Sequence, residues 1–155
     1  MTATQGLAGK RALELFCGVG FFTLPLSRNF EHVEVLESNP AAVADLEENL
    51  RENRGENCRI SRSDLLGALR AGQLRSGQFD LLLIDPPRTG LPKTTVEAIA
   101  RLNSSDFVYV SCDPATLARD LRILLSCNYE IVSLDLLDLF PQTHHLETVA
   151  RLRKP

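Results

Sequence analysis

The sequence from residue 12 to residue 23 reads ALELFCGVGFFT, and the expected fold class follows from this stretch. Its first five residues are mostly apolar and predict a buried strand over 12–16. Gly18 and Gly20 then allow a tight turn into a helix. In open, doubly wound α/β sheets, the turn after the first strand is where the backbone approaches a ligand. We therefore expect a ligand-binding loop here, although the spacing also suits a plain turn between strand and helix.

The rest of the chain alternates short β-rich runs with helical stretches. Runs such as LLLI and FVYV are almost wholly apolar, which is typical of parallel strands buried on both faces. Helices are expected after Asn39-Pro40 and after Asp113-Pro114, because each pair offers a side-chain cap and a proline at the first helical position. The further strands are expected over residues 32–36, 58–61, 79–84, 107–110, 131–137 and 147–152.

This alternation predicts an α/β fold with a doubly wound, Rossmann-like sheet of seven mostly parallel strands. Only residues 138–145 connect the last two strands. A link this short does not provide a crossover helix, so these two strands should form an antiparallel pair at one edge. We therefore expect the last strand to run antiparallel in the sheet.

Length and composition narrow the class of protein. With 155 residues, 44% of them hydrophobic, the chain is expected to be one domain over residues 1–155. No apolar run approaches the ~18 residues that a membrane helix needs. A net charge of −3 argues against a domain that grips nucleic acid by itself. The four cysteines lack zinc spacing, so we expect no metal site, reduced thiols and a cytoplasmic location.

Three acidic residues lie in or after the first three strands. Glu14 lies inside the first strand, where a buried carboxylate needs a partner. Glu37 ends the second strand, where an acid typically accepts the ribose hydroxyls of a nucleotide. Asp64 follows the third strand and suits either an adenine amine or a helix N-cap. Because Thr23 replaces the third glycine of the dinucleotide fingerprint, we expect S-adenosylmethionine, an adenosine ligand without a pyrophosphate, rather than NAD.

The fourth and fifth strands also end in reactive side chains. Asp85 is followed by Pro86 and Pro87, which hold the chain extended and aim the carboxylate at the crevice; the alternative is a rigid turn before a helix. Cys112 directly precedes a capped helix, whose dipole favours a thiolate, although position alone leaves a structural role open. Glu147 opens the last strand, where a glutamate is more often solvated than functional.

Four blocks of the sequence carry a family resemblance: LELFCGVGFFTLPLS, LLLIDPPRTGL, VYVSCDPATLARDL and LFPQTHHLETVARL. Together they resemble the RNA uracil-5-methyltransferases, which act on tRNA or rRNA. The resemblance implies a class I S-adenosylmethionine-dependent fold and an RNA substrate. It implies that Cys112 adds to C6 of uracil, that Glu147 removes the C5 proton, and that Asp85 lines the pocket between base and methyl donor. The expected cofactor contacts are Glu14, Phe16, Gly18, Gly20, Glu37, Asp64 and Asp85.

This sequence departs from the family pattern in three respects. Asp113 stands where an asparagine is usual, and Phe21 stands where an asparagine often follows the second glycine. Family members also carry domains ahead of this unit, often including an RNA-binding barrel. We therefore expect the RNA to be held mainly by domains absent from this chain, and the chain alone to be weakly active.

Two other functions remain open. The chain could be a cofactor-binding module that works only with a partner chain or with the missing domains. It could also methylate an amine, with Cys112 merely structural; the arginine after the two prolines argues against this, because amine methyltransferases usually have an aromatic residue there. A dehydrogenase that uses NAD comes last, because the third glycine is absent.

Overall fold

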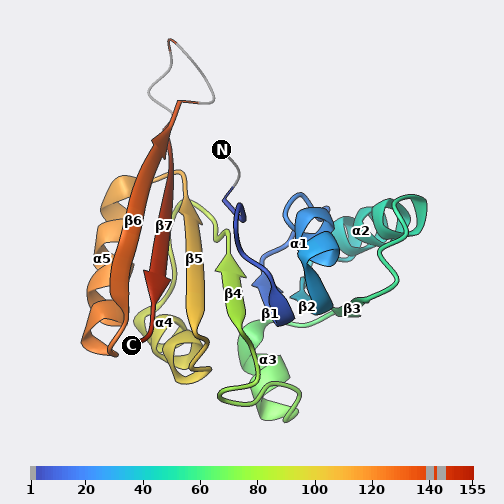
Figure 1. The fold of residues 1–155 in the computed structure, drawn as a ribbon, viewed down its shortest axis with the longest axis horizontal. Helices are drawn as coiled ribbons and strands as arrows, with labels where there is room; N and C mark the ends of the chain where they lie inside the picture. The colour runs from blue at the N-terminus through green and yellow to red at the C-terminus, as the bar shows by residue number, and fades with distance from the viewer. Residues whose placement is uncertain (1–2, 139–141, 143–145) are drawn as a thin grey trace.

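The protein is described by a computed structural model for residues 3–138, 142 and 146–155. In this part of the chain seven strands form one sheet: β1 (Gly9–Leu15), β2 (Phe30–Leu36), β3 (Cys58–Ser61), β4 (Leu81–Ile84), β5 (Asp106–Ser111), β6 (Glu130–Leu137) and β7 (Glu147–Arg153). Their order is β3-β2-β1-β4-β5-β7-β6 (Figure 1).

The sheet is parallel from β3 to β5, and β7 runs antiparallel to both of its neighbours. The predicted seven-stranded, mostly parallel sheet with an antiparallel last strand is therefore confirmed. The last two strands do pair at one edge. The order shows in addition that β7 lies between β5 and β6, so β6 forms the edge and β7 joins it to the parallel part.

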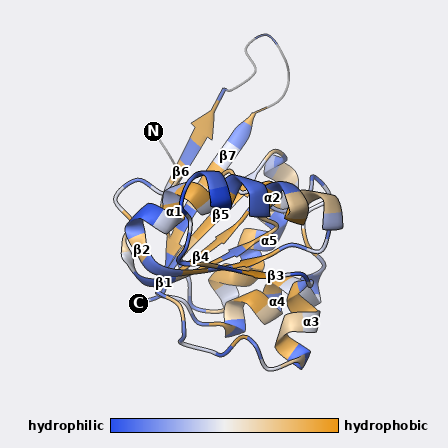
Figure 2. Ribbon diagram, turned by 90° about the vertical axis from the view of Figure 1, so that its right-hand side faces the viewer, coloured by the Kyte–Doolittle hydropathy of each residue, from blue (hydrophilic) through white to orange (hydrophobic). Residues whose placement is uncertain are grey.

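Five helices in the described part of the chain cover the two faces of this sheet. They are α1 (Thr23–Asn29), α2 (Pro40–Glu52), α3 (Leu65–Arg70), α4 (Lys93–Arg101) and α5 (Pro114–Ser126). Figure 2 shows α1 and α2 on one side of the sheet and α3 and α4 on the other. The core divides in the same way, because residues of α1 and α2 pack in one apolar cluster and residues of α3, α4 and α5 in another.

Local sequence explains where the main helices begin. The Asn39 side chain accepts hydrogen bonds from the first turn of α2, and the Asp113 side chain accepts one from Thr116 N–H in α5. Both α2 and α5 have proline at their first position, as expected. The all-apolar run of β4 is buried along its whole length, because helices or neighbouring segments cover both faces of this central strand.

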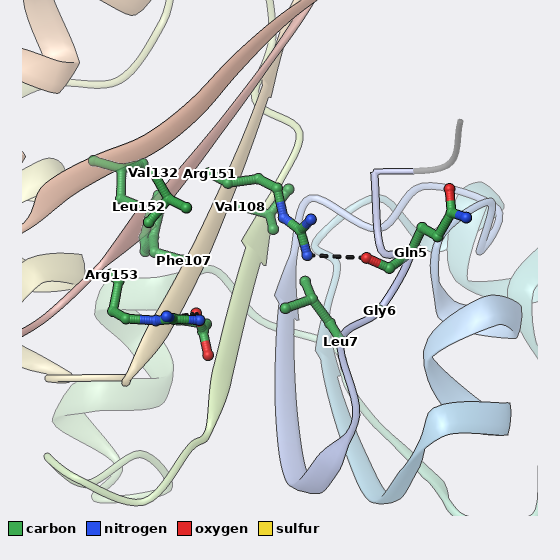
Figure 3. A pocket seen from close by; sticks show the side chains of 10 residues that line it. Gln5, Gly6, Leu7, Phe107, Val108, Val132, Arg151, Leu152 and Arg153 are labelled. Atoms are coloured by element: carbon green, nitrogen blue, oxygen red, sulfur yellow. Dashed lines mark hydrogen bonds and ion pairs between the residues drawn. The ribbon is translucent and has the colours of Figure 1, made fainter.

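The N-terminal segment packs beside the sheet on the side of α1 and α2. Ala3 and Leu7 contact the core on that face, and Arg151 of β7 donates a hydrogen bond of 3.1 Å to the Gln5 carbonyl (Figure 3). The small pocket drawn there lies at the amino end of β5, so it is separate from the crevice described below. No helix in the described part of the chain is long and apolar enough to cross a membrane.

The order of the strands determines where a ligand-binding crevice lies in this fold. The chain moves from β1 outward to β2 and β3, and then returns to β4 on the other side of β1. The loops after β1 and β4 therefore diverge at the carboxyl ends of two neighbouring strands. In open α/β sheets, ligands bind at this switch point.

Candidate active site

The glycine loop between β1 and α1 has a backbone shape that few residues tolerate. Gly20 has φ +94°, and a Cβ there would lie 2.5 Å from Leu46 Cδ1 of α2. The Asn49 amide of the same helix donates a 2.8 Å hydrogen bond to the Val19 carbonyl. Phe16, at the start of the loop, also has a left-handed backbone, with φ 61°. The loop is therefore fixed against α2 by both packing and hydrogen bonding.

The Glu37 carboxylate joins this loop to the end of β2. Its Oε2 accepts the Gly18 N–H at 3.0 Å, and its Oε1 accepts the N–H groups of Ser38 and Asn39, each at 2.8 Å. An ionised carboxylate offers about four acceptor sites, so one remains for a ligand hydroxyl. The acid predicted to contact a ribose is thus held rigidly at the switch point.

A small pocket lies beside Glu37, at the carboxyl ends of the first three strands. Asp64 lines it and also accepts the Gly67 N–H at 2.6 Å as the N-cap of α3. The capping interpretation of Asp64 is therefore confirmed, while its contact with an adenine amine stays a prediction. Apolar walls with two carboxylates suit an adenosine group. The lining residues are Leu15, Phe16, Leu36, Glu37, Ser38, Ser63, Asp64 and Leu65.

Glu14 lies in β1 directly beneath the loop and is buried. The Thr23 hydroxyl donates a 2.7 Å hydrogen bond to Glu14 Oε2. Burial raises the pKa of Glu14 to about 8; the Thr23 hydrogen bond opposes this rise, and the charge of Asp85 adds to it. The sequence indicated that this acid needs a partner, but not that the residue replacing the third glycine supplies it.

The reactive side chains come together where β4, β5 and β7 meet. In the antiparallel pair of β5 and β7, Ser111 is opposite Thr148. Cys112 directly follows β5 and Glu147 is the first residue of β7, so both lie at the same end of this antiparallel pair. Asp85 follows β4, the other neighbour of β5 (Figure 1). Three residues chosen from separate parts of the sequence therefore share one edge of the sheet.

Asp85 is the most perturbed group at this edge. Burial raises the pKa of its carboxyl to about 6, and the nearby charge of Glu147 adds to the rise. A carboxyl with this pKa can change its protonation state near neutral pH, which suits a group that handles protons.

The four cysteines are free and have different surroundings. Cys17 is buried, and burial together with the charges of Glu14 and Glu37 raises the pKa of its thiol far above the usual range. Burial also raises the pKa of Cys58 to about 11. Neither thiol suits a nucleophile, because the thiolate is the reactive form.

Cys112 is half-buried, just before α5. The Ser111 hydroxyl donates to the Asp113 carbonyl at 3.0 Å, and Asp113 Oδ1 accepts the Thr116 N–H at 2.8 Å. This cap lowers the pKa of Asp113, and the charge of Arg88 also favours its ionised form. The Asp113 carboxylate is thus engaged in capping the helix that Cys112 directly precedes.

The segment between β6 and β7 falls largely outside the described residues. The residues of the last of the four motifs that lie outside the described part are Phe140, Pro141, Thr143, His144 and His145. Among the residues that the structure does describe, no three His, Cys, Asp or Glu side chains gather as metal ligands would.

Comparison with known proteins settles the family. A model of the tRNA (uracil-5-)-methyltransferase family matches residues 1–155, the whole chain. The chain belongs to the tRNA (uracil-5-)-methyltransferase family. The resemblance expected from the four sequence blocks is therefore confirmed.

Curated relatives in this family include an RNA-modifying enzyme of known target. The chain is 44% identical to the 23S rRNA (uracil(1939)-C(5))-methyltransferase RlmD of Aeromonas hydrophila, over 92% of this chain and 33% of the relative. It is 40% identical to an uncharacterized RNA methyltransferase of Aquifex aeolicus, again over 92% of this chain and 33% of the relative. The chain thus spans about a third of the length of the curated relatives it matches.

Solved structures confirm the fold class. The crystal structure of the Pyrococcus abyssi tRNA (uracil-54, C5)-methyltransferase, in complex with S-adenosyl-L-homocysteine, matches with a TM-score of 0.79 at 32% identity, over 94% of this chain and 35% of that one. A precorrin-6y C5,15-methyltransferase from Geobacter metallireducens matches with a TM-score of 0.81 at 15% identity, over 99% and 84% of the two chains, which shows the fold alone. The family member described here has the class I S-adenosylmethionine-dependent methyltransferase fold.

Proposed function

We propose that this chain is the catalytic part of an RNA methyltransferase that transfers a methyl group from S-adenosylmethionine to C5 of a uridine. The observation that carries the proposal is the pairing of β5 with both β4 and β7, which brings Cys112, Glu147 and Asp85 to the same end of three neighbouring strands. A thiol, a base and a polarisable carboxyl beside a cofactor loop are the groups that C5 methylation needs. Family membership supports the same reaction.

The residues beside the glycine loop fit S-adenosylmethionine. Glu37 would hold the ribose hydroxyls with its free acceptor site, and Phe16 with the leucines of the pocket would enclose the adenine. Asp64 would accept from the adenine amine while still capping α3. Gly18 has no neighbouring atom within 4 Å of an added Cβ, so its backbone can be approached from the crevice. The cofactor supplies an activated methyl group on a sulfonium.

The reaction requires C5 of uracil to become a nucleophile. The Cys112 thiolate forms a bond to C6, and the electron pair of the C5=C6 bond moves onto the C4 carbonyl as an enolate. The enolate C5 then takes the methyl group, and the sulfonium sulfur keeps the electron pair of the broken bond. Glu147 removes the proton from C5, the C5=C6 bond re-forms, and the thiolate is expelled.

Asp85 has a supporting position in this scheme. It follows β4, which lies between β1 with its glycine loop and β5 in the sheet, and the charge of Glu147 contributes to raising its pKa. A carboxyl with a pKa near 6 is partly protonated at neutral pH and can donate a hydrogen bond to a uracil carbonyl. Such a bond would stabilise the enolate, where negative charge develops.

The RNA partner would be selected by regions that this chain does not span. The net charge of −3 gives little electrostatic attraction for phosphates, and the relatives are about three times longer. A target uridine in folded RNA would be splayed out to reach the crevice. The family includes enzymes that act on tRNA and enzymes that act on rRNA, and we propose a tRNA or an rRNA as the substrate. Four free cysteines support a reducing location, the cytoplasm.

A covalent trap tests this proposal. Fluorine at C5 cannot leave as a proton, so RNA with 5-fluorouridine should stay bonded to the enzyme after methyl transfer. Mass spectrometry of the denatured mixture should find the protein–RNA adduct with S-adenosylmethionine present. Cys112→Ala should abolish it, while Cys127→Ala, the matched control, should retain it.

If the Cys112→Ala variant still forms the adduct, the nucleophile is another residue. If it still methylates RNA and the product carries N-methyl groups, the protein is an amine methyltransferase. Because the RNA-selecting regions are not in this chain, the assay should be repeated with those regions of a relative supplied in trans.

A further inference from the structure

A buried hydrogen-bond cluster lies behind the reactive edge, and the mechanism above does not use it. Asp120 of α5 has no exposed surface. Its Oδ2 accepts the Tyr109 hydroxyl at 2.7 Å and the Leu91 N–H at 3.0 Å, and its Oδ1 accepts Arg119 Nε at 2.8 Å. A buried carboxylate is tolerated only when its acceptor sites are engaged in this way. We refer to Tyr109, Arg119 and Asp120 as the clasp.

The clasp grips the loop that begins at Asp85. Besides the Leu91 N–H held by Asp120, the Arg119 guanidinium donates to the Thr89 carbonyl at 3.3 Å and to the Leu91 carbonyl at 3.0 Å. Hydrogen bonds therefore hold the loop through both a backbone N–H group and backbone carbonyl groups. Such hydrogen bonds fix its backbone rather than its side chains.

The fit between clasp and loop leaves no free space at its tightest point. Gly90 has φ +65°, and a Cβ there would lie 2.5 Å from Arg119 Nη2 and 3.0 Å from Asp120 Oδ2. One helical turn earlier, the Thr116 hydroxyl donates to the Arg88 carbonyl at 3.3 Å. The loop backbone is thus seated directly on α5.

The clasp also connects this loop to the nucleophile. Tyr109 lies in β5, three residues before Cys112, and its pKa is raised well above the usual value by burial and by Asp120, so its hydroxyl remains a donor. Arg119 and Asp120 lie in α5, which begins two residues after Cys112. The strand before the thiol and the helix after it therefore both hold the loop that carries Asp85.

We propose that Asp120 is a positioning residue that sets the Asp85 loop at a fixed place relative to Cys112. This inference rests on the proposed function for the roles of Asp85 and Cys112, but the clasp itself can be tested without turnover. Displacing a reacting group by about 1 Å can cost roughly 100-fold in rate. The clasp should therefore act on the chemical step more than on cofactor binding, because the glycine loop and Glu37 lie on the other side of β4.

The first test is the titration of Asp85 itself, followed by carboxyl carbon NMR in the wild-type chain and in Asp120→Asn. If the variant loosens the loop, water reaches Asp85 and Glu147 moves away from it. Both changes lower the pKa of Asp85 from about 6 toward its ordinary value of 3.8. The Glu14 resonance reports the buried carboxyl in the neighbouring strand β1 and should change little.

Two further variants make this result specific. Tyr109→Phe removes one hydroxyl and no charge, so a downward shift of the Asp85 pKa in this variant cannot come from a lost charge. Asp106→Asn is the matched control, because Asp106 is also an aspartate paired with an arginine, Arg153, but lies at the opposite end of β5. It should leave Asp85 unchanged. If Asp120→Asn does not fold, Tyr109→Phe decides the matter.

The second test separates chemistry from binding. At saturating RNA and cofactor, Asp120→Asn should slow formation of the 5-fluorouridine adduct by about 30-fold or more, with the affinity for S-adenosylhomocysteine within threefold of wild type. A folded variant with an unchanged Asp85 pKa and an unchanged saturating rate would overturn the inference. So would an equal loss in cofactor affinity. If the wild-type chain forms no adduct even with the RNA-selecting regions of a relative supplied in trans, the proposed function fails, and the titration still tests the clasp.

Discussion

The polar side chains in the two halves of the crevice differ in their hydrogen bonding. In the cofactor half, Glu37 accepts three backbone N–H groups and Glu14 accepts the Thr23 hydroxyl. In the reactive half, no hydrogen bond within the described residues reaches the side chains of Asp85, Cys112 or Glu147. The first set holds a loop in shape; the second is left open to a substrate. We therefore expect substitutions in the first half to change stability and cofactor binding together, and substitutions of Cys112 or Glu147 in the second half to change chemistry alone.

The largest effect should come from Glu147→Gln in the reactive half. Methylated product should fall by about 100- to 1,000-fold, because the C5 proton has no base. The covalent enzyme–RNA species should accumulate with ordinary uridine RNA, since it forms but does not resolve. Denaturing gels and mass spectrometry would detect it. Glu130→Gln, at the exposed start of β6, is the control and should turn over normally; unchanged turnover in Glu147→Gln would remove that residue from the mechanism.

Next is Glu37→Ala in the cofactor half. The affinity for S-adenosylhomocysteine should drop by about 30- to 100-fold, because a charged hydrogen bond to the ligand is lost and the glycine loop loses its anchor. Calorimetry measures this directly. The melting temperature should fall as well, in contrast to Glu147→Gln. Glu31→Ala, at the exposed start of β2, should change neither quantity; a similar loss there would show that the effect is not local.

Glu14 should make stability depend on pH. Its pKa is about 8 in the folded protein against 4.5 ordinarily, so the folded state keeps a proton that the unfolded chain has lost. Stability should therefore decrease as pH rises toward 8, by about 1.4 kcal/mol per pH unit at most. Urea unfolding between pH 6.5 and 8 isolates this effect, because Asp85 titrates near 6.

The matched variant is Glu14→Gln, which should flatten this dependence, whereas Glu56→Gln on the surface should retain it. An equally steep slope in Glu14→Gln would assign the effect to another group.

The smallest effect should be Ser104→Ala, which lies far from both halves, before β5. Its buried hydroxyl is 3.3 Å from the Tyr129 hydroxyl, and losing this hydrogen bond should cost about 1 kcal/mol in urea unfolding. Cofactor affinity should be unchanged. This variant provides the baseline of a purely structural change; a drop in affinity here would mean that stability and binding cannot be separated in this domain.

Much of the architecture could be predicted because its signals are local. The apolar run of β4, the Asn39 and Asp113 caps, and the glycines after β1 each depend on a few adjacent residues. Because the carboxyl ends of parallel strands meet at one edge, the residues after those strands were expected to share a site. Glu37 does lie at the loop as expected, whereas the catalytic assignments of Cys112, Glu147 and Asp85 stay predictions.

Other features depend on contacts that no local pattern indicates. The partner of Glu14 is Thr23, which the sequence showed only as a missing glycine. The clasp joins α5 to the loop after β4 through Asp120, an acidic residue in an otherwise ordinary amphipathic helix. A signal was present, since Asp120 falls in the buried stripe of α5 with Leu117, Leu121 and Leu124. The pattern could not show which donors it would meet.

The sequence by itself determined the strand–helix alternation, the glycine loop and the family, because periodicity, turn chemistry and motif spacing are properties of neighbouring residues. Only the tertiary structure decided that β7 lies between β5 and β6, which brings Glu147 to the end of the sheet where Cys112 follows β5. The physical reason is that strand pairing is chosen by the burial of both faces of the sheet at once. That choice depends on every helix packed against those faces, and no single segment contains it.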